Sequence, residues 1–192
     1  MDKLGHASPE SRSGAPPDGS RKARRKKKRR KVSPILRLLV KLAVLALFTL
    51  LLFTFVVDVH ICRGNGMYPF LQDGDVLIAY KLETCQVGDA VVYRRPDTGE
   101  KAVSRVVAVN SDTVEITPLG ELLVNSFVPD DKVFYATKPL EGSAITYPVS
   151  LTGGVFLLDD HRTEGLDSRL FGEVPRSELL GKVVYVFRRR GI

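Results

Sequence analysis

Three groups of side chains in this 192-residue sequence could carry out chemistry. Cys62 could act as a thiolate nucleophile with His60 or His161 as its base, although no sequence signature supports that pairing. Ser104 could act as a hydroxyl nucleophile, but no Lys or His lies within two residues to take its proton. The third group is the charged segment 159–172, DDHRTEGLDSRLFG, where His161 could also serve as a base.

The two cysteines, Cys62 and Cys85, leave two interpretations open. A disulfide is one expectation if they face an oxidising compartment, and two buried or unreactive thiols are the other. The glycines around residues 64–66 lack the helix and Lys of a phosphate loop. Since no other metal or nucleotide motif occurs, we expect no metal and no cofactor.

These groups must be positioned by strands, because no helical periodicity longer than two turns follows residue 58. Short runs rich in Val, Ile, Tyr and Phe instead alternate with turn residues such as QDGD and PDTGE, which predicts a mostly antiparallel β domain. The predicted strands are residues 75–80, 90–94, 102–109, 113–117, 122–127, 133–136, 154–158 and 182–187.

Charge is segregated along the chain, whose formal net charge is +7. Residues 7–20 are polar and rich in Pro and Gly, which predicts disorder. The block Arg21–Val32 is almost entirely basic, so two uses compete for it: neutralising nucleic-acid phosphates, or orienting a membrane helix that follows. The next segment favours the membrane, and we expect no nucleic-acid partner.

Residues 35–57 are apolar except for Arg37 and Lys41 near the basic end, and they predict a single transmembrane helix. A cleaved signal peptide is the alternative, but no pair of small residues ends the segment. The basic flank then predicts that the helix crosses the plasma membrane with the N-terminus on the cytoplasmic side. We expect residues 1–34 to form a disordered tail and residues 58–192 to form an extracytoplasmic β domain.

Four segments in this order, after one N-terminal anchor, resemble the bacterial type I signal peptidase family. The segments are GNGMYP at 64–69, GDAVV at 88–92, AVSRVVAV at 102–109 and the charged segment 159–172. The last matches the family pattern D-N-R-x-x-S-x-D-S-R-x-F-G at Asp160, Arg162, Asp167, Ser168, Arg169, Phe171 and Gly172. The resemblance implies a peptide-binding groove at Gly64, Met67 and Pro69, and a bracing framework at Asp160, Arg162, Asp167, Ser168 and Arg169, although these charges could also be solvated.

The resemblance implies a serine endopeptidase with a Ser–Lys dyad, in which a buried neutral Lys takes the serine proton. The nucleophile of the pattern S-M-x-P falls on Gly66, and the base of the strand V-K-R-V falls on Ser104. Within the charged segment, the supporting Ser falls on Gly165, while Asp159 and His161 replace the Gly and Asn that flank Asp160. The framework residues therefore match while the reactive ones do not.

We therefore expect a non-catalytic member of the family that holds extended segments of exported preproteins or pilin-like chains, for example as a pilus-assembly chaperone. The alternative is an active signal peptidase, with an unrecognised nucleophile or with its natural dyad replaced in this sequence. A purely architectural resemblance is the third reading. Gly66→Ser combined with Ser104→Lys would test whether the framework can still support cleavage.

Overall fold

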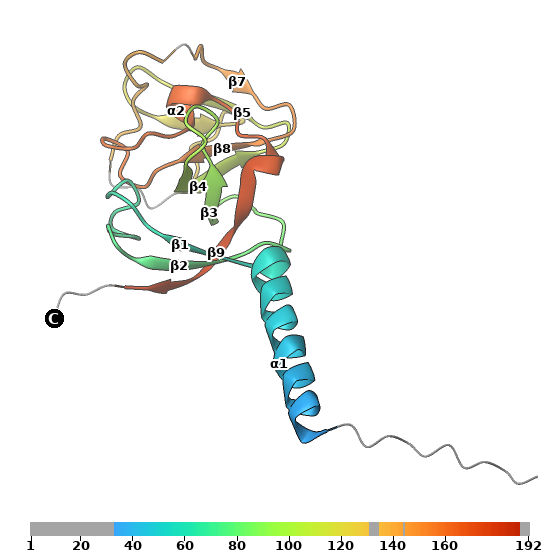
Figure 1. Cartoon of the computed structure of the whole chain (residues 1–192). Coiled ribbons are helices and arrows are strands. Elements are labelled where there is room, and N and C mark those ends of the chain that lie inside the picture. The colour runs from blue at the N-terminus through green and yellow to red at the C-terminus, as the bar shows by residue number, and fades with distance from the viewer. Residues whose placement is uncertain (1–32, 131–134, 144, 189–192) are drawn as a thin grey trace, which may run out of the picture. The chain divides into compact units, whose positions relative to one another are not determined.

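The computed structural model describes residues 33–130, 135–143 and 145–188 (Figure 1). The predicted tail of residues 1–34 lies almost wholly outside this range. The predicted strand at 133–136 is described only at Tyr135 and Ala136, which are not in a strand.

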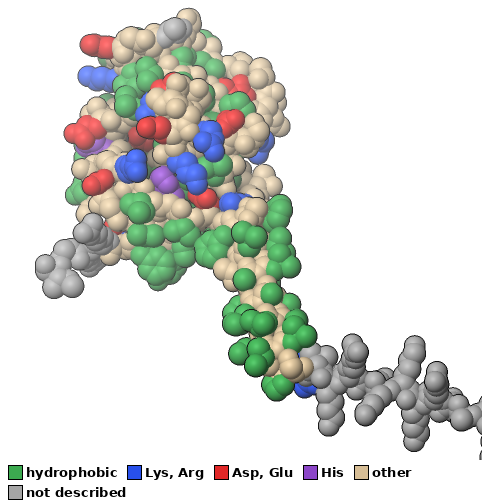
Figure 2. All heavy atoms as spheres, in the orientation of Figure 1, with side chains coloured by type: hydrophobic (Ala, Val, Ile, Leu, Met, Phe, Trp, Pro, Cys, Tyr) green, Lys and Arg blue, Asp and Glu red, His purple; other side chains and the backbone are tan. Residues whose placement is uncertain are grey.

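A helix, α1, runs from Pro34 to Leu51 and continues as a π-helical turn, η1, from Leu52 to Val56. This 23-residue segment has a mean hydropathy of 2.5 and is long and apolar enough to cross a membrane. Its two threonine hydroxyls are satisfied internally, since Thr49 and Thr54 donate to the carbonyl oxygens of Leu45 and Leu50. Figure 2 shows apolar side chains along this segment.

Six antiparallel strands form the main sheet, in the order β1-β2-β9-β3-β4-β8. They are β1 (Val57–Ile61), β2 (Val76–Tyr80), β9 (Leu179–Phe187), β3 (Ala90–Arg94), β4 (Lys101–Val109) and β8 (Val155–Leu158). The prediction of a mostly antiparallel β fold is confirmed. Strand β1 was not predicted, because no turn residue separates it from the apolar segment that precedes it.

A second sheet has the order β6-β5-β7, with β5 at Thr113–Ile116, β6 at Leu122–Val124 and β7 at Val149–Ser150. The predicted strand 122–127 is shorter than expected because Asn125 and Ser126 have φ of 53° and 68°. These two left-handed residues turn the chain, and Phe127 then pairs back with Val124. Two short helices, α2 (Ser168–Phe171) and η2 (Arg176–Glu178), complete the described elements.

The hydrophobic core lies on both faces of the main sheet. Along β3, Ala90 and Val92 pack on one face with Met67 and Leu71, while Val91 and Tyr93 pack on the other. Because successive strand residues point to opposite faces, burial of both sets means that the centre of the sheet is covered on both sides. This arrangement carries Ser104 of β4 into the interior, where it is 1% exposed.

Candidate functional site

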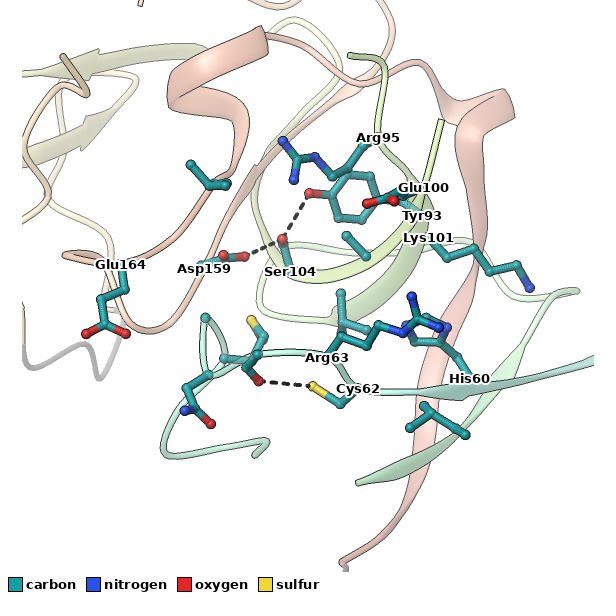
Figure 3. Close-up of a pocket in the computed structure, with 18 of the residues that line it drawn as sticks. His60, Cys62, Arg63, Tyr93, Arg95, Glu100, Lys101, Ser104, Asp159 and Glu164 are labelled. Carbon is teal, nitrogen blue, oxygen red and sulfur yellow. Dashed lines mark hydrogen bonds between the residues drawn. The ribbon is translucent and has the colours of Figure 1, made fainter. Parts of the chain in front are cut away.

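The register of β4 against β8 places Ser104 and Asp159 together. Arg105 pairs with Leu158, so the next position along this antiparallel ladder sets Ser104 opposite Asp159, just after β8 ends. Ser104 donates a hydrogen bond from Oγ to Asp159 Oδ1 over 2.5 Å, and its Oγ lies 3.2 Å from the Tyr93 hydroxyl (Figure 3). The position expected to hold the catalytic base therefore holds an alcohol bound to a carboxylate.

The Asp159 carboxylate also fills the space beside the expected nucleophile position. A Cβ atom added to Gly66 would lie 2.5 Å from Asp159 Oδ2, which is closer than van der Waals contact allows. A Cβ atom added to Gly165 would lie 2.6 Å from Asp159 Cβ. Rotation of the Asp159 side chain about its Cα–Cβ bond cannot relieve that second contact, so the glycine at 165 and the aspartate at 159 depend on each other.

Burial, followed by the neighbouring Asp167 carboxylate, raises the pKa of the Asp159 carboxyl from 3.8 to about 7. The hydrogen bond from Ser104 and the Arg169 charge act in the opposite direction. Burial likewise raises the pKa of the Tyr93 phenol well above its usual value. The Asp159 carboxyl therefore changes its charge near neutral pH, whereas the Tyr93 phenol stays neutral.

A serine hydroxyl has one proton, so the two contacts of Ser104 depend on the charge of Asp159. When Asp159 is ionised, Ser104 donates to it and can accept from Tyr93. When Asp159 is neutral, its own proton can be donated to Ser104, which then donates to Tyr93. The three side chains thus form a chain of two hydrogen bonds. The donor and acceptor of each bond exchange when Asp159 takes up one proton.

The expected framework residues Asp167, Ser168 and Arg169 are buried. Arg169 donates to Asp167 from Nε and the backbone N–H to Oδ1, over 2.9 and 3.1 Å, and from Nη2 to Oδ2 over 2.9 Å. Asp167 Oδ2 also accepts the backbone N–H of Asp159 over 3.0 Å, and Ser168 Oγ accepts that of Leu157 over 3.0 Å. These bonds fix the backbone that carries the Asp159 carboxylate.

The other two expected framework residues hold the same segment from its opposite end. Asp160 forms a two-pronged ion pair with Arg105 of β4, with nitrogen–oxygen distances of 2.7 and 2.6 Å. Arg162, 1% exposed, donates from Nε to the carbonyl oxygen of Asp159 over 2.7 Å and from Nη1 to Thr137 over 2.7 Å. The hydrogen bonds show which groups these residues contact. That the residues brace the site for function stays a prediction.

The site opens into a pocket of about 670 Å³ that is lined by Ser104 and Asp159 (Figure 3). Of the expected groove residues, Gly64 and Met67 line this pocket, whereas Pro69 is exposed and is not part of its lining. Its walls include residues 59–61 of β1 and residues 101–104 of β4. Strands that are distant in the main sheet therefore face one cavity.

The alternative reactive groups are poorly arranged for catalysis. Cys62 and Cys85 are buried free thiols, so no disulfide joins them in this structure. Burial, followed by the Asp75 charge, raises the pKa of Cys62 to about 11, which makes its thiolate scarce at neutral pH. The His161 ring packs edge-on against Tyr135 with centroids 4.5 Å apart, and His161 does not line the pocket.

Sequence reasoning identified Asp159 and Gly165 only as departures from a pattern, and it did not single out Tyr93. The contacts of Asp159 depend on the pairing of β4 with β8, which brings Ser104 and Asp159 together although they are 55 positions apart. One signal was available in the sequence: glycines at 66 and 165 accompany an aspartate at the position where the pattern has glycine.

Comparison with known proteins gives a consistent set of matches. A family model described as signal peptidase, peptidase S26, matches residues 35–188. Probable signal peptidase I-1 of Synechocystis is 28% identical over 166 residues, covering 76% of this chain and 79% of that protein. Signal peptidase IB of Staphylococcus aureus strain COL is 27% identical over 172 residues, covering 80% of this chain and 89% of that protein.

Among solved structures, the chain is similar to a signal peptidase I of Enterococcus faecalis V583, with a TM-score of 0.46 and 21% sequence identity. That similarity covers 54% of this chain and 100% of the other.

Proposed function

This chain belongs to the signal peptidase family, peptidase S26, and on that premise we propose that it is a non-catalytic member that binds extended segments of exported proteins. The observation that carries the proposal is the Asp159 carboxylate, which occupies the space beside Gly66 that a nucleophilic side chain would need. Gly66 has no side chain to form an acyl-enzyme, and Ser104 has no amine to accept a proton.

Two unpaired strand edges support the binding of an extended peptide. Strand β1 pairs only with β2, and within the described residues its outer edge has no partner strand. Residues 101–104 of β4 pair with β3 on one side, while β8 pairs only with the later part of β4, from Arg105 onward. Since both free edges line the same pocket, an incoming strand can form main-chain hydrogen bonds with them.

The proposal places the protein in the plasma membrane through the one apolar helix found in the described residues, with the basic N-terminal block on the cytoplasmic side and residues 58–192 outside. Exposed apolar side chains also occur on β1 and β9, including Val59, Ile61, Tyr185 and Phe187, which suits a domain held against a lipid surface (Figure 2). Its clients would be exported preproteins or pilin-like chains, which it would hold as a surface-protein or pilus assembly chaperone.

The test uses the full chain in lipid nanodiscs with two readouts. Fluorescence anisotropy measures binding of a labelled peptide that spans a signal-peptide cleavage site, and mass spectrometry monitors the same peptide for cleavage. We expect saturable binding without cleavage. The control peptide carries N-methyl groups at alternate backbone positions, and it should bind weakly because it cannot complete the strand pairing. Absence of binding to the unmethylated peptide would contradict the proposal.

The hydrogen bond between Ser104 and Asp159 favours a second candidate function, cleavage of preproteins by Ser104 with Asp159 as the general base. In this mechanism Asp159 would take the proton as Ser104 Oγ attacked the peptide carbonyl, with Ser104 as the nucleophile that the family pattern does not predict. Cleavage that is lost in both Ser104→Ala and Asp159→Asn would establish this activity. Burial of Ser104, at 1% exposure, opposes it.

A further inference from the structure

One oxygen of the buried Asp159 carboxylate has no partner in the described part of the chain. Oδ1 accepts the Ser104 hydroxyl, whereas Oδ2 forms no hydrogen bond or ion pair with any residue that the structure describes. The side chain is held in the wall of the 670 Å³ pocket, and Asp159 is 8% exposed. Buried charges are normally paired. Oδ2 is not among the enclosed unpaired atoms of the described residues, so it is accessible to a partner that enters the pocket.

The neighbouring cations are committed to other groups. Arg169 pairs with Asp167, and Arg105 pairs with Asp160. Two further cations line the pocket and are also paired: Arg95 with Asp97 over 2.6 Å, and Lys101 with Asp58 over 2.9 Å. The exposed Arg63 extends toward His60 and away from Asp159 (Figure 3).

The site has room for a cation that comes from outside the chain. Ser104 is short, and Gly66 and Gly165 add no side chains beside Asp159. The pocket volume falls within the roughly 300–1,000 Å³ range of pockets that hold small ligands. Because the free edges of β1 and β4 line this pocket, a strand bound between them would carry its side chains past the carboxylate.

We propose that this pocket recognises a cationic group of the bound polypeptide, which pairs with the Asp159 carboxylate. This inference rests on the proposed peptide-binding function, and it specifies the class of segment that is bound. The cation forms an ion pair with Asp159 Oδ2, while Ser104 continues to donate its hydrogen bond to Oδ1. A lysine or arginine side chain and a free α-amino group share the required chemistry, and the experiment separates these sources.

The surrounding charges predict how recognition depends on pH. Asp160, Asp167 and Arg169 surround Asp159 within its own segment, and Tyr93 of β3 and Cys62 face it from other elements. A ligand cation pairs with the ionised carboxylate, and the pKa of that carboxyl lies near 7 in the unliganded protein. Binding of a cationic peptide should therefore strengthen as the pH rises through about 7, and binding of a neutral peptide should not.

The test uses the full chain in lipid nanodiscs and acetylated alanine-based decapeptides that carry one lysine at each position in turn. Matched peptides carry arginine or norleucine at the same position, and one polyalanine peptide keeps a free N-terminus. At pH 8 we expect lysine or arginine in one register to bind about tenfold more tightly than norleucine. The preference should shrink at pH 5.5.

Two protein variants locate the recognition. Asp159→Asn keeps the shape of the side chain but removes its charge, and it should abolish the preference for a cation while leaving norleucine peptides bound. Glu164→Gln is the matched control, because Glu164 is an exposed carboxylate that lines the same pocket. This variant should keep the preference for a cationic peptide. Tightening only with the unacetylated polyalanine peptide would identify an α-amino group as the cation.

The outcomes separate the inference from the proposed function. If acetylated lysine and norleucine peptides bind equally at every position and a free N-terminus adds nothing, the inference is overturned while peptide binding stands. A preference that survives Asp159→Asn also overturns it. If no peptide binds, the proposed function fails as well. Should Asp159→Asn fail to fold, the pH profile of a His60→Gln variant decides, because His60 also lines the pocket and its own titration would change the charge there. A lysine preference that still grows through pH 7 in that variant supports recognition by Asp159, and a flat profile overturns it.

Discussion

Restoring a Ser–Lys dyad in this chain requires more than its two missing side chains. Gly66→Ser with Ser104→Lys leaves the Asp159 carboxylate in place, and the added Cβ would lie 2.5 Å from Oδ2. Asp159→Gly removes that overlap and also the 2.6 Å contact at position 165, so that Gly165→Ser is left with a 3.0 Å contact to Asp167 Oδ2. Neither Gly66 nor Gly165 has a positive φ, so the backbone accepts serine at both positions. We therefore expect the fourfold variant, and not the twofold one, to cleave signal peptides.

The size of the difference follows from the introduced lysine. Beside the Asp159 carboxylate its ammonium is stabilised, so its pKa stays at or above the reference value of about 10.4, and about 0.4% is neutral at pH 8. Without the carboxylate, burial lowers the pKa of that lysine, and a value near 8 makes about half of it neutral. The fourfold variant should therefore cleave at least about 100-fold faster than the twofold variant.

The assay compares initial rates of cleavage of an internally quenched signal-peptide substrate by each variant in nanodiscs at pH 8. The matched control carries Gly66→Ser, Asp159→Gly and Gly165→Ser with the native Ser104, and it should be inactive because it has no amine base. Equal rates for the twofold and fourfold variants would refute the argument that Asp159 obstructs the dyad. Binding of the substrate by all variants, measured by anisotropy, ensures that the rates report on chemistry.

Three further measurements test the energetics of the site. The pKa of Asp159 is higher in the folded protein than the 3.8 of an unperturbed aspartate, so stability should fall as pH rises from about 4 to about 7, by up to about 1.4 kcal/mol per unit. Thermal unfolding across this range should show that slope, and Asp159→Asn should flatten it and be more stable at pH 8. Arg169→Met should cost about 3–5 kcal/mol in chemical denaturation, because it leaves the buried Asp167 carboxylate unpaired. Asp97→Ala breaks the more exposed pair with Arg95 and should cost less than about 1 kcal/mol, and an equal loss in both variants would contradict the role of burial.

The sequence predicted the main strands well, because alternation and turn residues are local signals. Strands β2, β3, β4, β5, β8 and β9 all overlap predicted runs. Strand β1 was missed because residues 57–61 continue the apolar segment without a turn. The two-residue β7 carries too little pattern to detect, and its pairing with β5 is a tertiary contact.

The site was only partly predictable. The resemblance to a family identified Gly66 and Ser104 as replaced positions, and it indicated the residues that surround them. It could not show that the Asp159 carboxylate lies beside both positions, because that contact depends on the register between β4 and β8. A restoration designed from the sequence alone would change positions 66 and 104 and retain the Asp159 carboxylate, which overlaps a Cβ atom at position 66.

The short connection between the apolar helix and the domain has a consequence for the proposed binding of exported polypeptides. Strand β1 begins at Val57, directly after the helical segment, and Lys81 Nζ donates to the carbonyl oxygens of Phe53 and Thr54 at the end of that segment. The pocket-lining residues of β1 therefore begin at Val59, three residues after the helical segment ends at Val56. A client anchored in the same bilayer would be confined to the membrane surface, where its effective concentration can reach the millimolar range. Weak contacts in the pocket would then suffice to hold a membrane-bound client, while the same segment free in solution would remain unbound.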